Sequence, residues 1–287
     1  MSSPIKKLLG QTAVYGLPSI VGRLLNFLLV PLYTEVFVNP AEYGVVSELY
    51  AWVAFLIVFL TFGMETAFFQ FLQKKEDKTK VFNQSFLSVL LVNSGFVLLL
   101  VFFNQSIADA MLFSDHTEYI ILLGVIVLID AVSALPLAKL RAEEKAVRFA
   151  SIQMGSILVN IGLNLIFMLV LFDPTRPEEG VVFILLANLA SSLIKPLFLY
   201  KDFLYVKLKI DFSFMKELVR YSFPLMIAGL AGIVNETIDR IMLKHMLYDG
   251  SISSIDYADE QVGIYSACYK LAMLVTIFLQ AYRYAAE

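Results

Sequence analysis

The stretch Phe82–Phe103, FNQSFLSVLLVNSGFVLLLVFF, contains no charged residue over its whole length. A segment needs about 20 mostly apolar residues to cross a hydrocarbon core of about 30 Å as a helix. It must be a helix because backbone N–H and C=O groups in lipid have to hydrogen-bond within the segment. This stretch is therefore predicted to be a transmembrane helix.

Seven further stretches on either side have the same character. They are Gln11–Val36, Val45–Leu72, Glu118–Leu140, Phe149–Phe172, Gly180–Phe203, Tyr221–Leu247 and Val262–Ala286. The first is not a signal peptide, because its apolar run exceeds the ~7–15 residues of a signal sequence and it carries Arg23 near its middle. The sequence thus predicts an all-α fold, a polytopic transmembrane bundle of eight helices.

The composition excludes a water-soluble protein. Hydrophobic residues make up 59% of the 287 residues and charged residues 16%, against about 25% charged in a typical soluble domain. A net charge of −3 provides no basic excess for binding a phosphate backbone, so nucleic acid is not an expected partner. The single cysteine, Cys268, and two histidines exclude Cys/His zinc patterns, and we expect no metal and no cofactor.

The positive charges of the connections alternate along the chain. Lys and Arg are retained on the cytoplasmic side of a membrane. The N-terminus and every second connection are rich in them: Lys6, Lys7, Lys74, Lys75, Lys78, Lys80, Lys139, Arg141, Lys145, Arg148, Lys201, Lys207, Lys209, Lys216 and Arg220. The other four connections, 37–44, 104–117, 173–179 and 248–261, carry only Arg176. We expect a multi-pass protein of the inner (plasma) membrane with both ends of this chain in the cytoplasm.

The last two predicted helices resemble the first two. Lys6-Lys7-Leu8-Leu9 precedes Leu17-Pro18, as Lys216-Glu217-Leu218-Val219 precedes Phe223-Pro224. Gly44, Ser47 and Tyr50 recur as Gly263, Ser266 and Tyr269 with the same spacing. We interpret residues 1–210 as a six-helix lobe and residues 211–287 as the first two helices of a second, parallel-repeated lobe. On this interpretation the chain is a truncated form or fragment, and an accidental likeness within a complete eight-helix protein is the alternative.

Several charged residues are predicted to lie inside the membrane. Arg23 is near the centre of its helix, where a lone charge costs about 2.5–3.5 kcal/mol, so it should face a cavity or a partner. Glu236, Arg240 and Lys244 are spaced so that they share one helix face. Asp130, Glu65, Lys195, Asp239 and Lys270 complete the set.

Two interpretations of these charges are open. In the first, Arg23, Lys195, Arg240 and Lys270 line a water-filled cationic cavity that accepts an anionic headgroup, and Asp130, Glu65, Glu236 and Asp239 are candidates for binding a coupling Na⁺ or H⁺. In the second, Arg23 pairs with Asp130 and Glu236 with Arg240 within the bundle. Lys244 and Arg283 are interpreted as interface anchors, and the tyrosines near helix ends as interfacial belts.

Four strings resemble the Wzx-type polysaccharide-unit flippases of the multidrug/oligosaccharidyl-lipid/polysaccharide exporter superfamily. They are LPSIVGRLLNFLLVPLYTEVFVNPAEYG at Leu17–Gly44, GMETAFFQF at Gly63–Phe71, IDRIML at Ile238–Leu243 and GIYSACYKLA at Gly263–Ala272. The resemblance implies two six-helix lobes around a cationic cavity. It also implies that this cavity carries a polyprenyl-diphosphate-linked oligosaccharide from the inner to the outer leaflet by alternating access, for surface polysaccharide or lipopolysaccharide biosynthesis.

The resemblance also suggests residues. Arg23 falls on an arginine common in the first helix of these flippases, and Arg240 and Lys270 fall within their IDR and GIY strings. Related lipid II flippases usually carry a second arginine where this chain has Leu29, which disfavours lipid II as the substrate. Expected partners are the lipid-linked oligosaccharide, membrane lipid, and a polysaccharide polymerase with glycosyltransferases.

Three alternatives to a flippase remain. A multidrug or cation antiporter of the same superfamily would favour an acidic cavity. A membrane-embedded glycosyl or acyl transferase would place catalytic carboxylates or histidines near loops, where His116 has no clear partner. A structural scaffold would pair every charge internally. No Walker loop, dinucleotide fingerprint or G-x-S-x-G motif occurs, so we expect a transporter and not an enzyme.

Overall fold

The computed structural model describes residues 4–207 and 209–286, with the side chains of residues 14–18, 20–207 and 209–272. Its elements are α1 (Pro4–Val36), α2 (Pro40–Thr61), α3 (Met64–Lys74), α4 (Lys78–Ala110), α5 (Thr117–Ala142), α6 (Ala146–Ile166), the π-helix η1 (Phe167–Leu171), α7 (Pro177–Leu204), α8 (Phe212–Leu247) and α9 (Ile252–Ala286). No strand occurs among these residues, which confirms the predicted all-α fold. The predictions on the side chains of Lys6, Lys7 and Arg283 lie outside the described residues.

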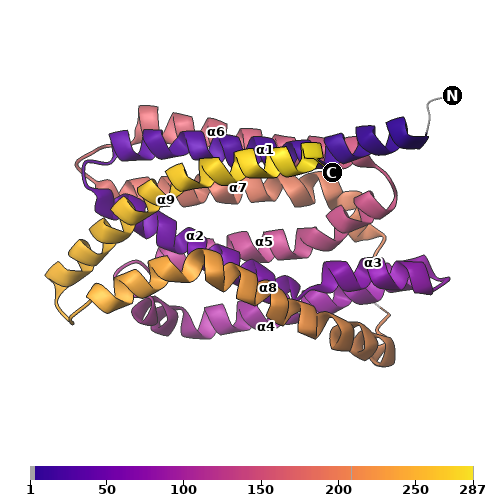
Figure 1. Ribbon diagram of the computed structural model, residues 1–287. Coiled ribbons are helices and arrows are strands. Elements are labelled where there is room, and N and C mark those ends of the chain that lie inside the picture. Colours follow the sequence, from indigo (N-terminus) through magenta and orange to yellow (C-terminus); the bar gives the residue numbers. More distant parts are fainter. Residues whose placement is uncertain (1–3, 208, 287) are drawn as a thin grey trace.

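The helices run back and forth along one axis, so their connections alternate between the two ends of the bundle (Figure 1). We call the end with the α3–α4, α5–α6 and α7–α8 connections the lysine-rich end, and the opposite end the lysine-poor end. Seven segments of the described chain are long and apolar enough to cross a membrane. They are Val14–Val36, Pro40–Lys74, Lys78–Ala110, Thr117–Ala142, Ala146–Leu171, Pro177–Leu204 and Phe212–Leu247. Much of the eighth predicted span, Val262–Ala286, has side chains outside the described residues.

The predicted helix Val45–Leu72 is wrong in one respect, because the structure breaks it between α2 and α3. Phe62 and Gly63 both have left-handed backbones, with φ of 36° and 67°. Two such residues end a right-handed helix, since its backbone requires negative φ. A Cβ on Gly63 would lie 2.9 Å from the Ser222 carbonyl oxygen of α8, so the close passage of α8 also favours glycine here.

Several helices extend beyond their predicted ends. α8 begins at Phe212 instead of Tyr221, where the Asp211 carboxylate accepts a hydrogen bond from the Phe214 N–H at 3.1 Å. This is an N-cap interaction, which hydropathy does not detect. The Lys80 ammonium also bonds Asp211, at 2.7 Å, and lowers the pKa of that carboxyl. Gln84 of α4 donates to the Lys209 carbonyl oxygen at 2.6 Å and accepts from the Asp211 N–H at 2.9 Å. The connection before α8 is thus fastened to α4.

Three apolar clusters among the described residues hold the bundle together, and two of them are large. One includes Leu49, Ile126 and Ile184 of α2, α5 and α7, and the other Phe68 and Leu218 of α3 and α8. Large apolar side chains also cover the outside of the helices, among them Val101, Phe102, Leu169, Val170 and Leu197. An apolar exterior around a packed interior is the arrangement required in lipid.

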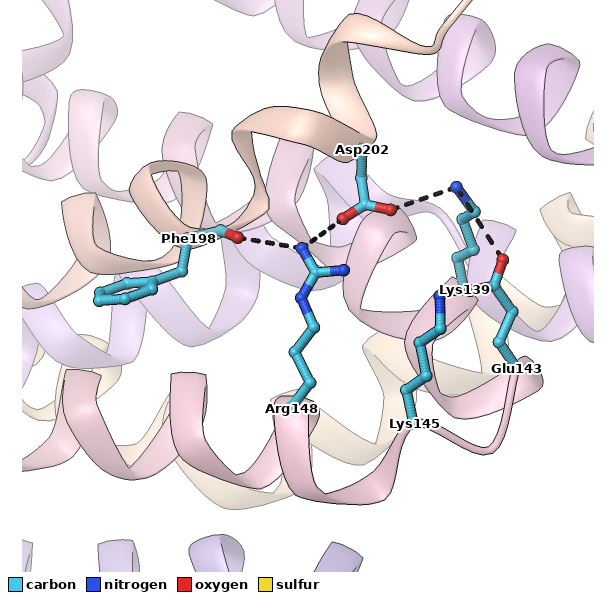
Figure 2. A network of polar contacts seen from close by, with 6 residues as sticks. All are labelled: Lys139, Glu143, Lys145, Arg148, Phe198 and Asp202. Atoms are coloured by element: carbon cyan, nitrogen blue, oxygen red, sulfur yellow. Dashed lines mark hydrogen bonds and ion pairs between the residues drawn. The ribbon is translucent and has the colours of Figure 1, made fainter.

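A charged network joins three helices at the lysine-rich end (Figure 2). Asp202 of α7, only 5% exposed, accepts hydrogen bonds from Lys139 of α5 at 3.2 Å and from Arg148 of α6 at 2.8 Å. Arg148 also donates to the Phe198 carbonyl oxygen at 3.1 Å. Lys139 and Arg148, on either side of the α5–α6 connection, therefore bind α5 and α6 to α7.

Candidate functional site

A cavity of about 610 Å³ lies among α1, α2, α6, α7, α8 and α9, so that both predicted lobes contribute to it. Its charged lining residues are Lys195, Glu236, Arg240 and Lys270. Its polar and aromatic lining includes Tyr15, Asn26, Tyr33, Tyr43, Ser47, Tyr50, Phe149, Gln153, Asn160, Asn188 and Tyr269. Three cations against one carboxylate make the described wall of the cavity net positive.

Lys195 of α7 is already paired. Its ammonium donates to the Asp130 carboxylate of α5 at 2.7 Å, with the two side chains 18% and 24% exposed. The alternative drawn from the sequence paired Asp130 with Arg23, whereas in the structure Asp130 pairs with Lys195. The positive charge of Lys195 on the cavity wall is therefore neutralised by Asp130.

Arg240 of α8 is held in place by its own helix and by α9. Its guanidinium donates to the Glu236 carbonyl oxygen at 2.7 Å and to the Asp239 carboxylate at 3.2 Å, and it lies 4.6 Å from the centre of the Tyr269 ring. Tyr265 of α9 also donates to Asp239. Arg240 is only 7% exposed and meets the backbone of Glu236, whereas the sequence alternative paired the two side chains.

Lys270 of α9 is the cation with the least compensation. Among the described residues it forms no ion pair, and it lies on the cavity wall together with Arg240. A lysine here needs an anion or water to satisfy its three N–H groups. Lys270 is therefore the best placed of the lining cations to meet an anionic ligand.

The structure brings together some of the predicted site residues and not others. The residues that line the cavity are Lys195, Glu236, Arg240 and Lys270. Asp130 forms an ion pair with Lys195, and Asp239 forms one with Arg240. The Arg23 side chain is exposed and is not among the lining residues. Glu65 forms an ion pair with Arg141 elsewhere in the bundle.

Two other predictions need correction. Lys244 is not an interface anchor, because its side chain is 0% exposed and forms ion pairs with Glu48 and Asp259. His116 has a partner after all, since its Nδ1 lies 2.8 Å from the Glu118 carboxylate. Within the described residues no three His, Cys, Asp or Glu side chains gather to hold a metal ion.

The aromatic and amide lining was missed by the sequence reasoning. Tyrosines interpreted as interfacial belts line the cavity instead, among them Tyr43 and Tyr50. Tyr43, Ser47 and Tyr50 are spaced four and three residues apart, which places them on one face of a helix. That spacing was the available signal, but the sequence does not say which face of α2 meets a cavity.

A polytopic helical bundle with a polar, cationic cavity between its helices has the architecture of a membrane transporter. The chain matches the family model described as "Polysaccharide biosynthesis protein" over residues 8–286, and it therefore belongs to that family. This agrees with the resemblance to the Wzx-type flippases. No curated protein and no solved structure matches the chain. It is a multi-pass membrane protein of polysaccharide biosynthesis.

Proposed function

We propose that the protein is a flippase that moves a polyprenyl-diphosphate-linked oligosaccharide from the cytoplasmic to the outer leaflet through this cavity. The observation that carries the proposal is the lining, which combines cations suited to phosphate with aromatic and amide side chains suited to sugar. The lysine-rich end then faces the cytoplasm, in accordance with the positive-inside rule.

The diphosphate is bound by Lys270 and Arg240. Hydrogen bonds from an ammonium or guanidinium to phosphate are about twice as strong as neutral ones, and the low dielectric of a membrane cavity strengthens them further. Lys195 contributes less, because Asp130 competes for it at 2.7 Å. Arg23 lies three residues before Asn26 on α1, and Asn26 lines the cavity, so we give Arg23 a role in guiding the headgroup toward the cavity.

The oligosaccharide is bound by the uncharged part of the lining. Tyr15, Tyr50 and Phe149 offer flat apolar faces, and Asn160 and Asn188 offer donors and acceptors for sugar hydroxyls. The polyprenyl tail stays in the bilayer against the apolar exterior. No covalent step is needed, because alternating access transfers an intact lipid.

A carboxylate in the cavity provides a candidate for ion coupling. Glu236 is the acidic residue of the described lining, whereas Asp130, Asp239 and Glu65 are each paired with a cation. We therefore assign a coupling Na⁺ or H⁺ to Glu236 before the other three. Lys270, a lining cation without an ion pair among the described residues, favours an anionic ligand over the cation of an antiporter.

A reconstituted flipping assay tests the proposal. The full chain is placed in liposomes with a fluorescent polyprenyl-diphosphate oligosaccharide, and loss of the inner-leaflet pool is followed. We expect flipping by the wild type and a decrease of about tenfold or more in Lys270→Met, because a hydrogen bond to a charged group contributes about 1.5–3 kcal/mol. The matched control is Lys201→Met, an exposed lysine of α7 outside the cavity lining. Equal rates for the wild type and Lys270→Met would overturn the proposal.

A further inference from the structure

The two predicted lobes touch most closely where α2 and α9 cross near the lysine-poor end. A Cβ on Gly44 would lie 1.9 Å from the Asp259 carbonyl oxygen, and a Cβ on Gly263 would lie 2.0 Å from the Pro40 carbonyl oxygen. Each glycine thus meets the residue one turn before the other glycine. Only glycine allows this backbone-to-backbone approach, and these are the two glycines of the repeated pattern.

A buried charged cluster joins the lobes beside this crossing. Lys244 Nζ of α8 lies 3.0 Å from Glu48 Oε2 of α2 and 3.0 Å from Asp259 Oδ1 of α9. The three side chains are 0%, 0% and 8% exposed. Lys244 Nζ also lies 3.7 Å from the centre of the Phe113 ring, and Trp52 donates to Glu48 at 3.3 Å.

The cluster lies beside the cavity. Ser47 and Ala51 flank Glu48 along α2 and line the cavity, and Arg240 lines it one turn before Lys244 on α8. α2 belongs to the first predicted lobe, whereas α8 and α9 belong to the second. The cavity cannot open at the lysine-poor end by a movement between the lobes unless Glu48 separates from Lys244.

The cluster is poorly suited to a purely structural role. Buried ion pairs are often no more stable than apolar residues of similar size, because desolvation offsets their attraction. One lysine and two carboxylates also leave a net charge of −1 in a site that is almost entirely buried. Either one proton or exposure to water relieves this excess charge.

We propose that Glu48, Lys244 and Asp259 form a proton-sensitive latch that closes the lysine-poor end of the cavity. Uptake of one proton makes the buried cluster neutral and favours the closed state. As the pH rises and that proton is lost, the free energy of the closed state increases relative to that of the open state, and opening to water becomes more favourable. As a gate of the transport cycle, the latch rests on the function proposed above.

Other titratable groups surround the cluster and set its field. Glu42 of α2, Tyr119 of α5 and Asp256 of α9 interact electrostatically with Asp259. Glu178 of α7 interacts with Glu42 and Tyr119, and Arg240 of α8 precedes Lys244 by one helical turn. Acidic groups predominate among them, which further favours holding a proton in the closed state.

Distances between spin labels test the latch in the full chain without substrate. Labels are attached to cysteines at Val38, before α2, and Ile252, at the start of α9, after replacement of Cys268; both sites are highly exposed at 86% and 83%. We expect one short distance at about pH 5.5 and a growing longer population at about pH 8.5. Glu48→Gln mimics the protonated carboxyl and should show the short distance at both values.

A matched control and a second variant make the result decisive. Glu217→Gln breaks an exposed ion pair with Lys75 at the lysine-rich end and should respond to pH as the wild type does. If Glu48→Gln does not fold, Asp259→Asn replaces it. The latch would be overturned if the distance between the labels in the wild type did not change with pH. It would also be overturned if the distance still changed with pH in both Glu48→Gln and Asp259→Asn. Because no substrate is present, a pH response together with absent flipping would overturn the proposed function alone.

Discussion

The three cations of the cavity differ in what already binds them. Asp130 neutralises Lys195, and Asp239 and the Glu236 carbonyl oxygen hold Arg240, whereas Lys270 forms no ion pair within the described chain. A buried charge that is held by a carboxylate attracts an additional anion less strongly. The order of importance for an anionic ligand is therefore Lys270, then Arg240, then Lys195.

The Lys195–Asp130 pair should show a strong energetic coupling. Lys195→Met leaves a partly buried carboxylate without its partner, and we expect a loss of about 1–3 kcal/mol in unfolding free energy. Asp130→Asn should cost a similar amount, and the double variant should recover much of the loss. Unfolding in detergent by a denaturant series measures the cycle. Additive losses in the double variant would show that the two residues do not interact.

The ring of Tyr269 should hold Arg240 in position for a phosphate. A cation–π contact contributes about 0.5–2 kcal/mol, so Tyr269→Ala should weaken binding of the polyprenyl-diphosphate oligosaccharide by about twofold to thirtyfold. Tyr269→Phe keeps the ring and serves as the control. Microscale thermophoresis on the full chain measures the affinity of each variant for the lipid-linked oligosaccharide. A loss of affinity in Tyr269→Phe as large as that in Tyr269→Ala would contradict the role given to the ring.

Sequence reasoning found part of this site. Helical spacing and depth in the membrane pointed to Lys195, Arg240, Lys270 and Glu236, which line the cavity. It did not place Asp130 opposite Lys195, because those residues lie on different helices whose packing no local pattern encodes. It missed the tyrosines for a similar reason, since an amphipathic aromatic residue suits a membrane interface as well as a polar cavity.

At the scale of elements, hydropathy predicted the seven spans found among the described residues but not the break at Phe62–Gly63. An apolar run signals burial in lipid and does not report left-handed backbones within it. The early start of α8 was missed because its first turn is stabilised by an Asp211 cap and not by an apolar run. Hydropathy does not predict where a membrane helix begins or ends when polar contacts determine that boundary.

Gly63→Ala should destabilise the protein. The substitution adds a Cβ to a residue with φ of 67° and places it 2.9 Å from the Ser222 carbonyl oxygen, so we expect a loss of about 1–3 kcal/mol. Gly95→Ala in α4 is the matched control, because its Cβ would meet nothing within 4 Å and alanine favours a helix. Thermal unfolding of both variants measures the difference. A Gly63→Ala protein as stable as Gly95→Ala would contradict the explanation of the break.

At the scale of the whole molecule, the alternating helices place the basic connections at one end of the bundle. That arrangement follows from the order of the spans, which the sequence predicted from apolar length, and the charges of the connections predicted which of them share an end. Gly44 meets Gly263, and these are the two glycines that the predicted repeat places in equivalent positions. The division into lobes at residue 210 falls within the connection fastened by Gln84, and it stays a prediction.

The orientation can be tested by labelling intact cells. In a protein without Cys268, cysteines replace Thr175 or Lys78, which are exposed at opposite ends. A membrane-impermeant thiol reagent should label Thr175→Cys in intact cells and Lys78→Cys only after permeabilisation, because the lysine-rich end faces the cytoplasm. The reverse pattern would mean that the bundle is inserted the other way round.

Capture of the substrate inside the cavity tests the central claim most directly. A photo-reactive amino acid replaces Asn188, which lines the cavity, or Leu197, which is 63% exposed on the apolar exterior of the same helix. Membranes that contain polyprenyl-diphosphate-linked oligosaccharide are then illuminated, and the sugar attached to the protein is measured. We predict sugar-bearing adducts at Asn188 and only lipid adducts at Leu197. Equal capture of sugar at both positions, or none at Asn188 in a protein that flips the lipid, would contradict a path through this cavity.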